Sequence, residues 1–143
     1  MKNEYSNQEI VTLILNFYTF TQGYWEDEVK LYTEIQKFIE DGYTCYDDKY
    51  PELIKSTDEG YEYLHCRIEE ISKKYIGFMM KNGMECSKDK VAEWFMKEFE
   101  LDDIETGEEI ARYITCNLYH YGYKAYSSSS RRKGNLYNII KMD

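Results

Sequence analysis

Apolar side chains recur every three or four residues along most of this chain, and that spacing is typical of helices with one buried face. The pattern predicts five helices, over about residues 7–21, 26–40, 57–82, 87–100 and 103–121. Shorter runs predict strands at 43–46, 53–55, 123–126 and 136–140, with a polar loop over 127–134 joining the last two. The expected fold class is therefore mainly α with small β-hairpins, an α+β protein.

Polar residues and glycines mark where these helices begin and end. Asn7 stands where the first helix begins, and Ser56 or Thr57 stands before the third. Such side chains can accept a hydrogen bond from the first backbone N–H groups of a helix. Gly42 and Gly83 follow the second and third helices, where glycine readily adopts the left-handed conformation. We expect these residues to be helix caps and helix ends.

The predicted helix over 57–82 carries an apolar seam whose spacing alternates between three and four residues. Its members are Tyr61, Leu64, Ile68, Ile71, Tyr75 and Phe78. Such a seam forms the contact between two helices of a coiled coil, so a homodimer through residues 57–82 is one interpretation. The seam is shorter than the three to four heptads typical of coiled coils. A long helix packed across the core of its own chain is therefore the favoured alternative.

Composition indicates a chain that can build a packed core. Aromatic residues make up 17% of it, and sixteen of them are tyrosines, which argues against wholesale disorder. The longest apolar run, over 10–20, is interrupted by polar residues and is shorter than the ~18 residues of a membrane span. The N-terminus lacks the apolar segment of a signal peptide. We expect a cytoplasmic protein without a membrane partner, whose four cysteines are reduced.

Charge is distributed unevenly along the chain, whose formal net charge is −9. Residues 1–60 hold five lysines and thirteen acidic residues, whereas residues 112–143 hold six Lys and Arg against Asp143 alone. The overall acidity argues against a protein that coats nucleic acid without specificity. The basic C-terminal part is where nucleic acid or an acidic partner would dock.

Residues with catalytic or metal-binding chemistry are few and scattered. Cys116 and His120 stand one helical turn apart, but a zinc site needs four converging ligands and no second pair has suitable spacing. The glycine patterns of phosphate-binding loops and the H-E-x-x-H pattern are absent from the sequence. We expect no enzymatic activity, no cofactor and no metal.

The order of three helices followed by a hairpin with a polar tip resembles the winged-helix variant of the helix-turn-helix class. Residues 57–143 give the fuller match, and residues 1–60 resemble a shortened, acidic second copy, with the helix over 57–82 shared between the two. In small microbial regulators a recognition helix ends in Gly, a hairpin follows, and a T-x-E-G-x-x-x-L helix begins. Here that string runs from Thr57 to Leu64.

The resemblance implies that the helix over 103–121 reads bases and that the hairpin tip contacts phosphates. Arg and Asn side chains can pair with guanine and adenine edges in the major groove, and the segment 127–135 combines serines with three adjacent cations that suit phosphate. Against this, acidic residues stand at the start of the same helix. The candidate DNA-binding residues are Arg112, Tyr113, Asn117, Lys124, Ser129, Ser130, Arg131, Arg132 and Lys133.

Two functions fit these observations. The first is a DNA-binding module, a small transcriptional regulator. The second is a viral or mobile-element inhibitor that uses an acidic, Tyr-rich surface to bind the basic surface of a host nucleic-acid-handling protein, as protein–protein interactions with complementary charge allow.

Overall fold

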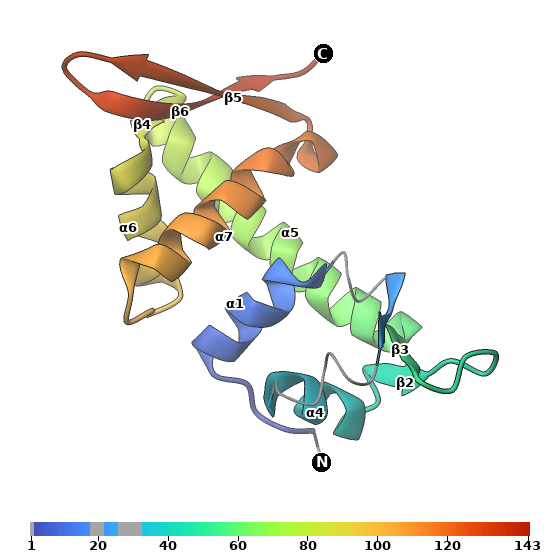
Figure 1. Cartoon of the computed structure of the whole chain (residues 1–143). Coiled ribbons are helices and arrows are strands. Elements are labelled where there is room, and N and C mark those ends of the chain that lie inside the picture. The colour runs from blue at the N-terminus through green and yellow to red at the C-terminus, as the bar shows by residue number, and fades with distance from the viewer. Residues whose placement is uncertain (1, 18–21, 26–32) are drawn as a thin grey trace. The chain divides into compact units, whose positions relative to one another are not determined.

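The computed structural model describes residues 2–17, 22–25 and 33–143. These residues form an α+β structure with two antiparallel three-stranded sheets (Figure 1). The chain divides into two compact units, unit 1 (residues 1–67) and unit 2 (residues 68–143), and the division lies inside the helix α5 (Asp58–Lys81). Among the helices described, none combines the length and the apolar character that crossing a bilayer requires.

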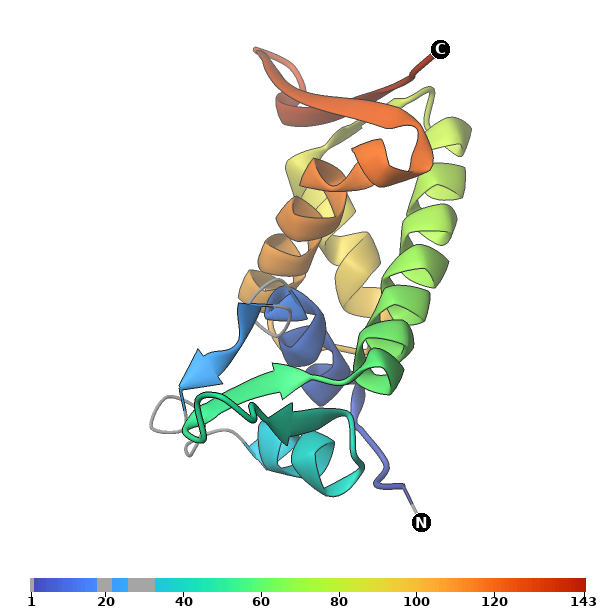
Figure 2. The ribbon, with the colours of Figure 1, turned by 90° about the vertical axis from the view of Figure 1, so that its right-hand side faces the viewer.

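Unit 1 is built around a sheet with strand order β1-β3-β2. Its elements are α1 (Asn7–Leu15), β1 (Tyr24–Trp25), α4 (Thr33–Glu40), β2 (Thr44–Tyr46), β3 (Leu53–Ser56) and the first turns of α5. In the central strand β3, Ile54 is buried and stands opposite Tyr24 on one side and Tyr46 on the other. Figure 2 shows α4 beside β2, which follows it after the turn at Gly42. The predicted strands at 43–46 and 53–55 are confirmed by β2 and β3.

The start of α1 differs from the prediction. Ser6, not Asn7, is its N-cap: the Ser6 hydroxyl accepts the Glu9 N–H at 3.1 Å, and the Glu9 carboxylate accepts the Ser6 N–H at 3.1 Å. This reciprocal pair satisfies two backbone N–H donors at once. A cap at Asn7 could not form the same pair, because Glu9 stands three residues after Ser6 and only two after Asn7. The end of α1 differs as well, since the helix stops at Leu15 with Asn16 as its C-cap, before the predicted end at about residue 21. Residues 18–21 and 26–32 of the two predicted helices lie outside the described residues.

Contacts between the end of α4 and the start of α5 account for two residues of the T-x-E-G string, Thr57 and Gly60. Gly42 ends α4 with φ +78°, as predicted. The Thr57 hydroxyl donates to the Gly42 carbonyl at 2.9 Å and accepts the Gly60 N–H at 3.1 Å, so Thr57 caps α5. A Cβ on Gly60 would lie 1.9 Å from the carbonyl oxygen of Tyr43. Glycine is therefore required at position 60 because the backbone leading into β2 contacts the first turn of α5.

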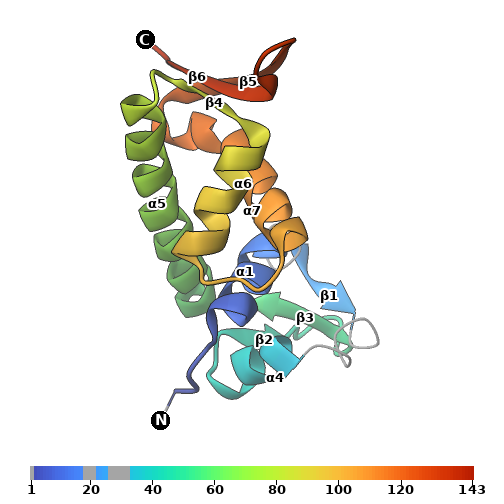
Figure 3. The same cartoon turned by 90° about the vertical axis from the view of Figure 1, so that its left-hand side faces the viewer.

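Unit 2 repeats the strand order of unit 1. Its elements are the last turns of α5, β4 (Glu85–Ser87), α6 (Lys88–Glu98), α7 (Ile104–Cys116), the 3-10 helix η1 (Leu118–Tyr121), β5 (Tyr123–Ser130) and β6 (Gly134–Lys141). The sheet order is β4-β6-β5, so in both units the third strand in sequence lies between the first and the second. Figure 3 shows this sheet at the end of the unit where α6 begins and α7 ends.

The terminal hairpin is longer than the sequence predicted. Residues 127–134 were expected to form a polar loop, but Ser127–Ser130 continue β5 and pair with β6 down to Ser130 opposite Gly134. Only residues 131–133 form the turn, which we call the hairpin tip. Gly134 adopts φ +74°, a conformation that suits the last position of a short hairpin loop. The sequence predicted a loop here because serine is typical of loops. These serines form a strand because their backbone pairs with β6, which their residue type does not indicate.

The core of unit 2 lies between α5, α6 and α7. Tyr75, Phe95, Ile110 and Ile114 are fully buried there. The Thr115 hydroxyl donates to the Tyr75 hydroxyl at 2.9 Å, which gives the buried phenol a partner. A Cβ on Gly107 would lie 2.7 Å from the Ala92 carbonyl oxygen, so glycine lets α7 approach α6 closely.

The apolar seam of α5 is largely internal. Leu64 and Tyr75 are fully buried, and Ile68 and Ile71 are each 6% exposed. These burials favour the interpretation that the seam is core of its own chain. The seam residue Tyr61, however, is 42% exposed. Dimerisation through 57–82 stays a prediction.

Candidate nucleic-acid interface

Helix α7 and its C-cap carry three of the candidate residues, and these residues differ in accessibility. Arg112 is exposed, whereas Tyr113 and Asn117 are half-buried. Asn117 is the C-cap of α7, and its side-chain amide donates to the Tyr113 carbonyl at 2.7 Å. Burial raises the pKa of Tyr113, and the nearby Tyr121 and Tyr119 raise it further. Of the three, Arg112 is the residue best placed to contact a ligand.

Arg112 also lies close to the sheet. Burial raises the pKa of Tyr137 in β6, and the Arg112 guanidinium counteracts this rise through its charge. At the other end of α7, Glu105, Glu108 and Glu109 are exposed. Positive charge on α7 is therefore concentrated toward the sheet, and negative charge toward the N-terminus of the helix.

The hairpin tip displays three consecutive cations. Arg131, Arg132 and Lys133 are exposed, and the turn is held by the Lys133 N–H, which donates to the Ser130 hydroxyl at 2.8 Å. The Lys133 ammonium pairs with the Glu85 carboxylate of β4 at 3.0 Å. Arg131 and Arg132 can each present a planar fork of donors to a phosphate.

The tip forms one wall of a groove that the sequence did not predict. This groove, which we call the tip groove, has a volume of about 380 Å³. It is lined by Asn82, Glu85, Cys86, Ser87, Lys90, Arg132, Lys133 and Leu136. Lys90 of α6 thus joins two of the predicted phosphate-binding residues. Its place follows from the pairing of β4 with β6, for which the sequence carries no local signal.

Lys124, Ser129 and Ser130 lie on β5 and are exposed. Lys124 lines a second groove of about 250 Å³, between β5 and the end of α7, and it is separated there from the cations of the tip. Four tyrosines share this groove: Tyr119, Tyr123, Tyr126 and Tyr137. Aromatic faces of this kind can stack on planar ligands. Of the predicted residues, Lys124 therefore lines this second groove, Arg132 and Lys133 line the tip groove, and Arg112 and Tyr113 lie on α7.

Unit 1 presents a different surface. Tyr46, Tyr50 and Tyr61 are 46%, 51% and 42% exposed. Acidic side chains are exposed near them in the sequence, namely Asp48, Glu52, Asp58 and Glu62. These exposed tyrosines and carboxylates have the chemistry expected of a partner for a basic protein.

The residues considered as metal ligands are not gathered into a site. Cys116 ends α7 and His120 lies in η1, and both are exposed. In the part of the chain that the structure describes, no three His, Cys, Asp or Glu side chains come together as a metal site would need.

Comparison with protein-family models, with curated proteins and with solved structures finds no match to this chain.

Proposed function

We propose that this protein is a DNA-binding module, a small transcriptional regulator made of two winged-helix-like units, in which unit 2 contacts DNA through α7 and the hairpin tip. The order of elements in unit 2, helix, strand, two helices and a terminal hairpin, supports this proposal. The strand order β1-β3-β2 in unit 1 and β4-β6-β5 in unit 2 supports a tandem arrangement.

The observation that carries the proposal is the hairpin tip. Two eight-residue strands end in a turn made entirely of cations, Arg131, Arg132 and Lys133. In a chain with a net charge of −9, this exposed cluster is a surface that a phosphate backbone can approach without repulsion. Arg112 on α7 adds a guanidinium that suits a guanine edge.

A salt titration tests the proposal. Replacement of all three tip cations by Ala should flatten the slope of log K against log salt by about 2–3 units for duplex DNA, because each neutralised phosphate contributes about 0.9. Arg112→Ala should relax sequence preference with little change in the slope, since base contacts specify and phosphate contacts position.

The matched control replaces three exposed lysines outside the tip groove, Lys73 and Lys74 of α5 and Lys97 of α6, by Ala. It removes the same charge from another surface and should leave the slope within about one unit of the unmodified protein. If the unmodified protein shows no binding to duplex DNA at ~50 mM salt, where screening is weak, the regulator proposal fails.

A second function is favoured by the exposed tyrosines and carboxylates of unit 1, which suit the basic surface of a nucleic-acid-handling protein. In this case duplex DNA should compete with the chain for the partner. Glu52→Lys combined with Glu62→Lys should abolish capture of that partner in a pull-down, whereas the triple Ala variant of the hairpin tip should not.

A further inference from the structure

The tip groove brings together charges from three separate parts of unit 2. Lys90 comes from the first turn of α6, Arg132 and Lys133 from the hairpin tip, and Glu85 from β4. Three cations thus face one carboxylate around a space of about 380 Å³. A site of this composition suits an anion, and the volume allows a phosphate group with the sugar attached to it.

The Glu85 carboxylate already pairs with one of these cations, Lys133. The distance between the Lys133 ammonium and the Glu85 carboxylate is 3.0 Å, and the two side chains are 65% and 39% exposed. Exposed pairs of this kind are weak because water screens them. A phosphate that enters the groove can therefore replace Glu85 as the partner of Lys133.

The other groups of the groove fit the same ligand. The guanidinium of Arg132 can bind two phosphate oxygens at once, and the ammonium of Lys90 supplies a point charge. The Ser87 hydroxyl accepts the Lys90 N–H at 3.2 Å and still has a proton that it can donate.

We propose that the tip groove seats one phosphate of a DNA strand between Lys90, Arg132 and Lys133, and that Glu85 limits the affinity by holding Lys133 until that phosphate replaces it. This inference rests on the proposed function, and it adds Lys90 to the phosphate contacts and gives Glu85 a regulatory role. It makes DNA affinity depend on an exchange of partners within the groove.

The test compares two pairs of single variants in the salt titration of the full chain with duplex DNA. Lys90→Ala should flatten the slope by about 0.9, whereas Lys97→Ala, in the last turn of the same helix, should not. Glu85→Gln should tighten binding at least threefold, whereas Asp102→Asn, beyond the far end of α6, removes the same charge and should change the affinity less than twofold.

A double-variant cycle separates partner exchange from a general charge effect. If Glu85 holds Lys133, then Lys133→Ala should weaken binding by a larger factor in the Glu85→Gln background than in the unmodified protein. Equal factors in the two backgrounds would overturn the exchange. Acetylation by an amine-reactive ester gives a second readout: duplex DNA should protect Lys90 and Lys133, but not Lys97.

The outcomes distinguish this inference from the function on which it rests. If the unmodified protein binds duplex DNA while Lys90→Ala and Glu85→Gln behave like their controls, the groove proposal is overturned and the regulator proposal stands. If the unmodified protein does not bind at ~50 mM salt, both are overturned. Circular dichroism of each variant confirms that the comparison is made between folded proteins.

Discussion

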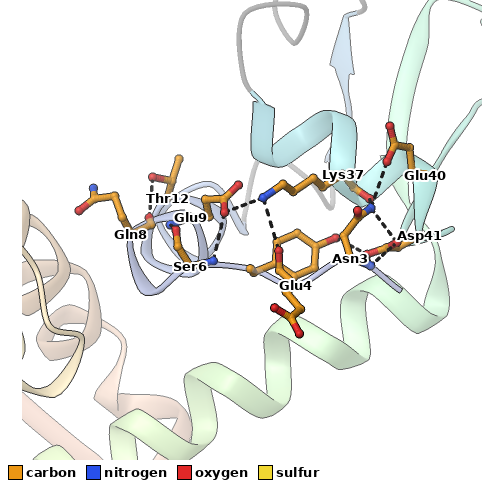
Figure 4. Close-up of polar contacts among 10 residues, drawn as sticks. Asn3, Glu4, Ser6, Gln8, Glu9, Thr12, Lys37, Glu40 and Asp41 are labelled. Atoms are coloured by element: carbon orange, nitrogen blue, oxygen red, sulfur yellow. Dashed lines mark hydrogen bonds and ion pairs between the residues drawn. The ribbon is translucent and has the colours of Figure 1, made fainter. Parts of the chain in front are cut away.

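The phenol of Tyr5 donates a 2.7 Å hydrogen bond to the carboxylate of Asp41, 36 residues further along the chain. The same carboxylate accepts hydrogen bonds from the backbone N–H of Asn3 at 2.9 Å and from the side-chain amide of Asn3 at 3.0 Å (Figure 4). Nearby, the Lys37 ammonium pairs with the Glu9 carboxylate at 2.8 Å. The Lys2 ammonium donates to the Asp41 carbonyl. The N-terminal segment is therefore fastened to the end of α4 by polar contacts, while the Tyr5 ring packs edge-on against Phe38 at 5.6 Å.

Tyr5→Phe is expected to lower the free energy of unfolding by about 1 kcal/mol, because it removes one hydrogen bond to a charged acceptor and keeps the ring. Tyr50→Phe is the control, since Tyr50 is 51% exposed and should change stability by less than about 0.5 kcal/mol. Urea denaturation measures both. Equal stability of the two variants would contradict a stabilising role of the Tyr5–Asp41 bond.

Stability is expected to fall with decreasing pH through three carboxylates of unit 1. Desolvation raises the pKa of Asp41 and of Glu9, but hydrogen bonds from Tyr5 and Asn3 to Asp41, and from Lys37 and Ser6 to Glu9, outweigh it. Both pKa values therefore lie below the ordinary 3.8 and 4.5. The backbone N–H of Tyr50 is the main cause that lowers the pKa of Asp47.

Because these pKa values are lower in the folded than in the unfolded chain, the stabilisation is complete above the unfolded values and is lost as pH falls through the folded values. Melting temperatures measured between pH 6 and pH 3 should decrease most steeply below about pH 4.5. Asp41→Asn should make this decrease shallower. A pH profile unchanged by that substitution would contradict the assignment.

Replacement by alanine should destabilise the fold at glycines in close contact with backbone and stabilise it at a helical glycine with open space. Gly60→Ala and Gly107→Ala should each destabilise the fold by about 1–3 kcal/mol, because the new methyl group meets a backbone carbonyl at 1.9 Å or 2.7 Å. Gly77, inside α5 near its C-terminal end, has open space around its Cβ position. Gly77→Ala should therefore stabilise the helix by about 0.5–1 kcal/mol. Thermal denaturation of the three variants gives the comparison.

EDTA is expected to leave the melting temperature unchanged. A structural zinc ion would contribute much of the folding free energy, so its removal would unfold the chain. Cys116→Ser provides the control for the pair Cys116 and His120. A drop in melting temperature that EDTA causes in the unmodified protein, and that Cys116→Ser abolishes, would contradict the expectation that this chain holds no metal.

Helical periodicity predicted the larger elements of the fold well, whereas the pairing of strands far apart in the sequence was not predicted. The helix over 57–82 and the hairpin at 43–55 follow from local patterns, and α5, β2 and β3 agree with them. In contrast, β4 has three residues, Glu85–Ser87, which are too few for their alternation to predict a strand. They form one because they pair with β6, with Cys86 opposite Tyr137.

In the candidate interface, too, the sequence predicted what depends on local order and missed what depends on tertiary packing. The cations of the hairpin tip could be identified from their order in the sequence, since a turn exposes its residues. Asn117 was expected to face outward as a base-reading residue, but it caps α7 and its amide is engaged with the Tyr113 carbonyl. Lys90 was missed because its proximity to Arg132 depends on how β4, α6 and β6 pack, which no spacing in the sequence encodes.

The extension of β5 through Ser127–Ser130 changes the thermodynamics of any encounter at the hairpin tip. A flexible loop of the same residues would lose backbone conformational entropy on binding, at about 1–2 kcal/mol for each residue that becomes fixed. In the ladder with β6 those four residues are already ordered, so this loss was incurred when the chain folded. Association through the tip then orders mainly the long side chains of Arg131, Arg132 and Lys133, and a larger part of the electrostatic attraction remains as affinity.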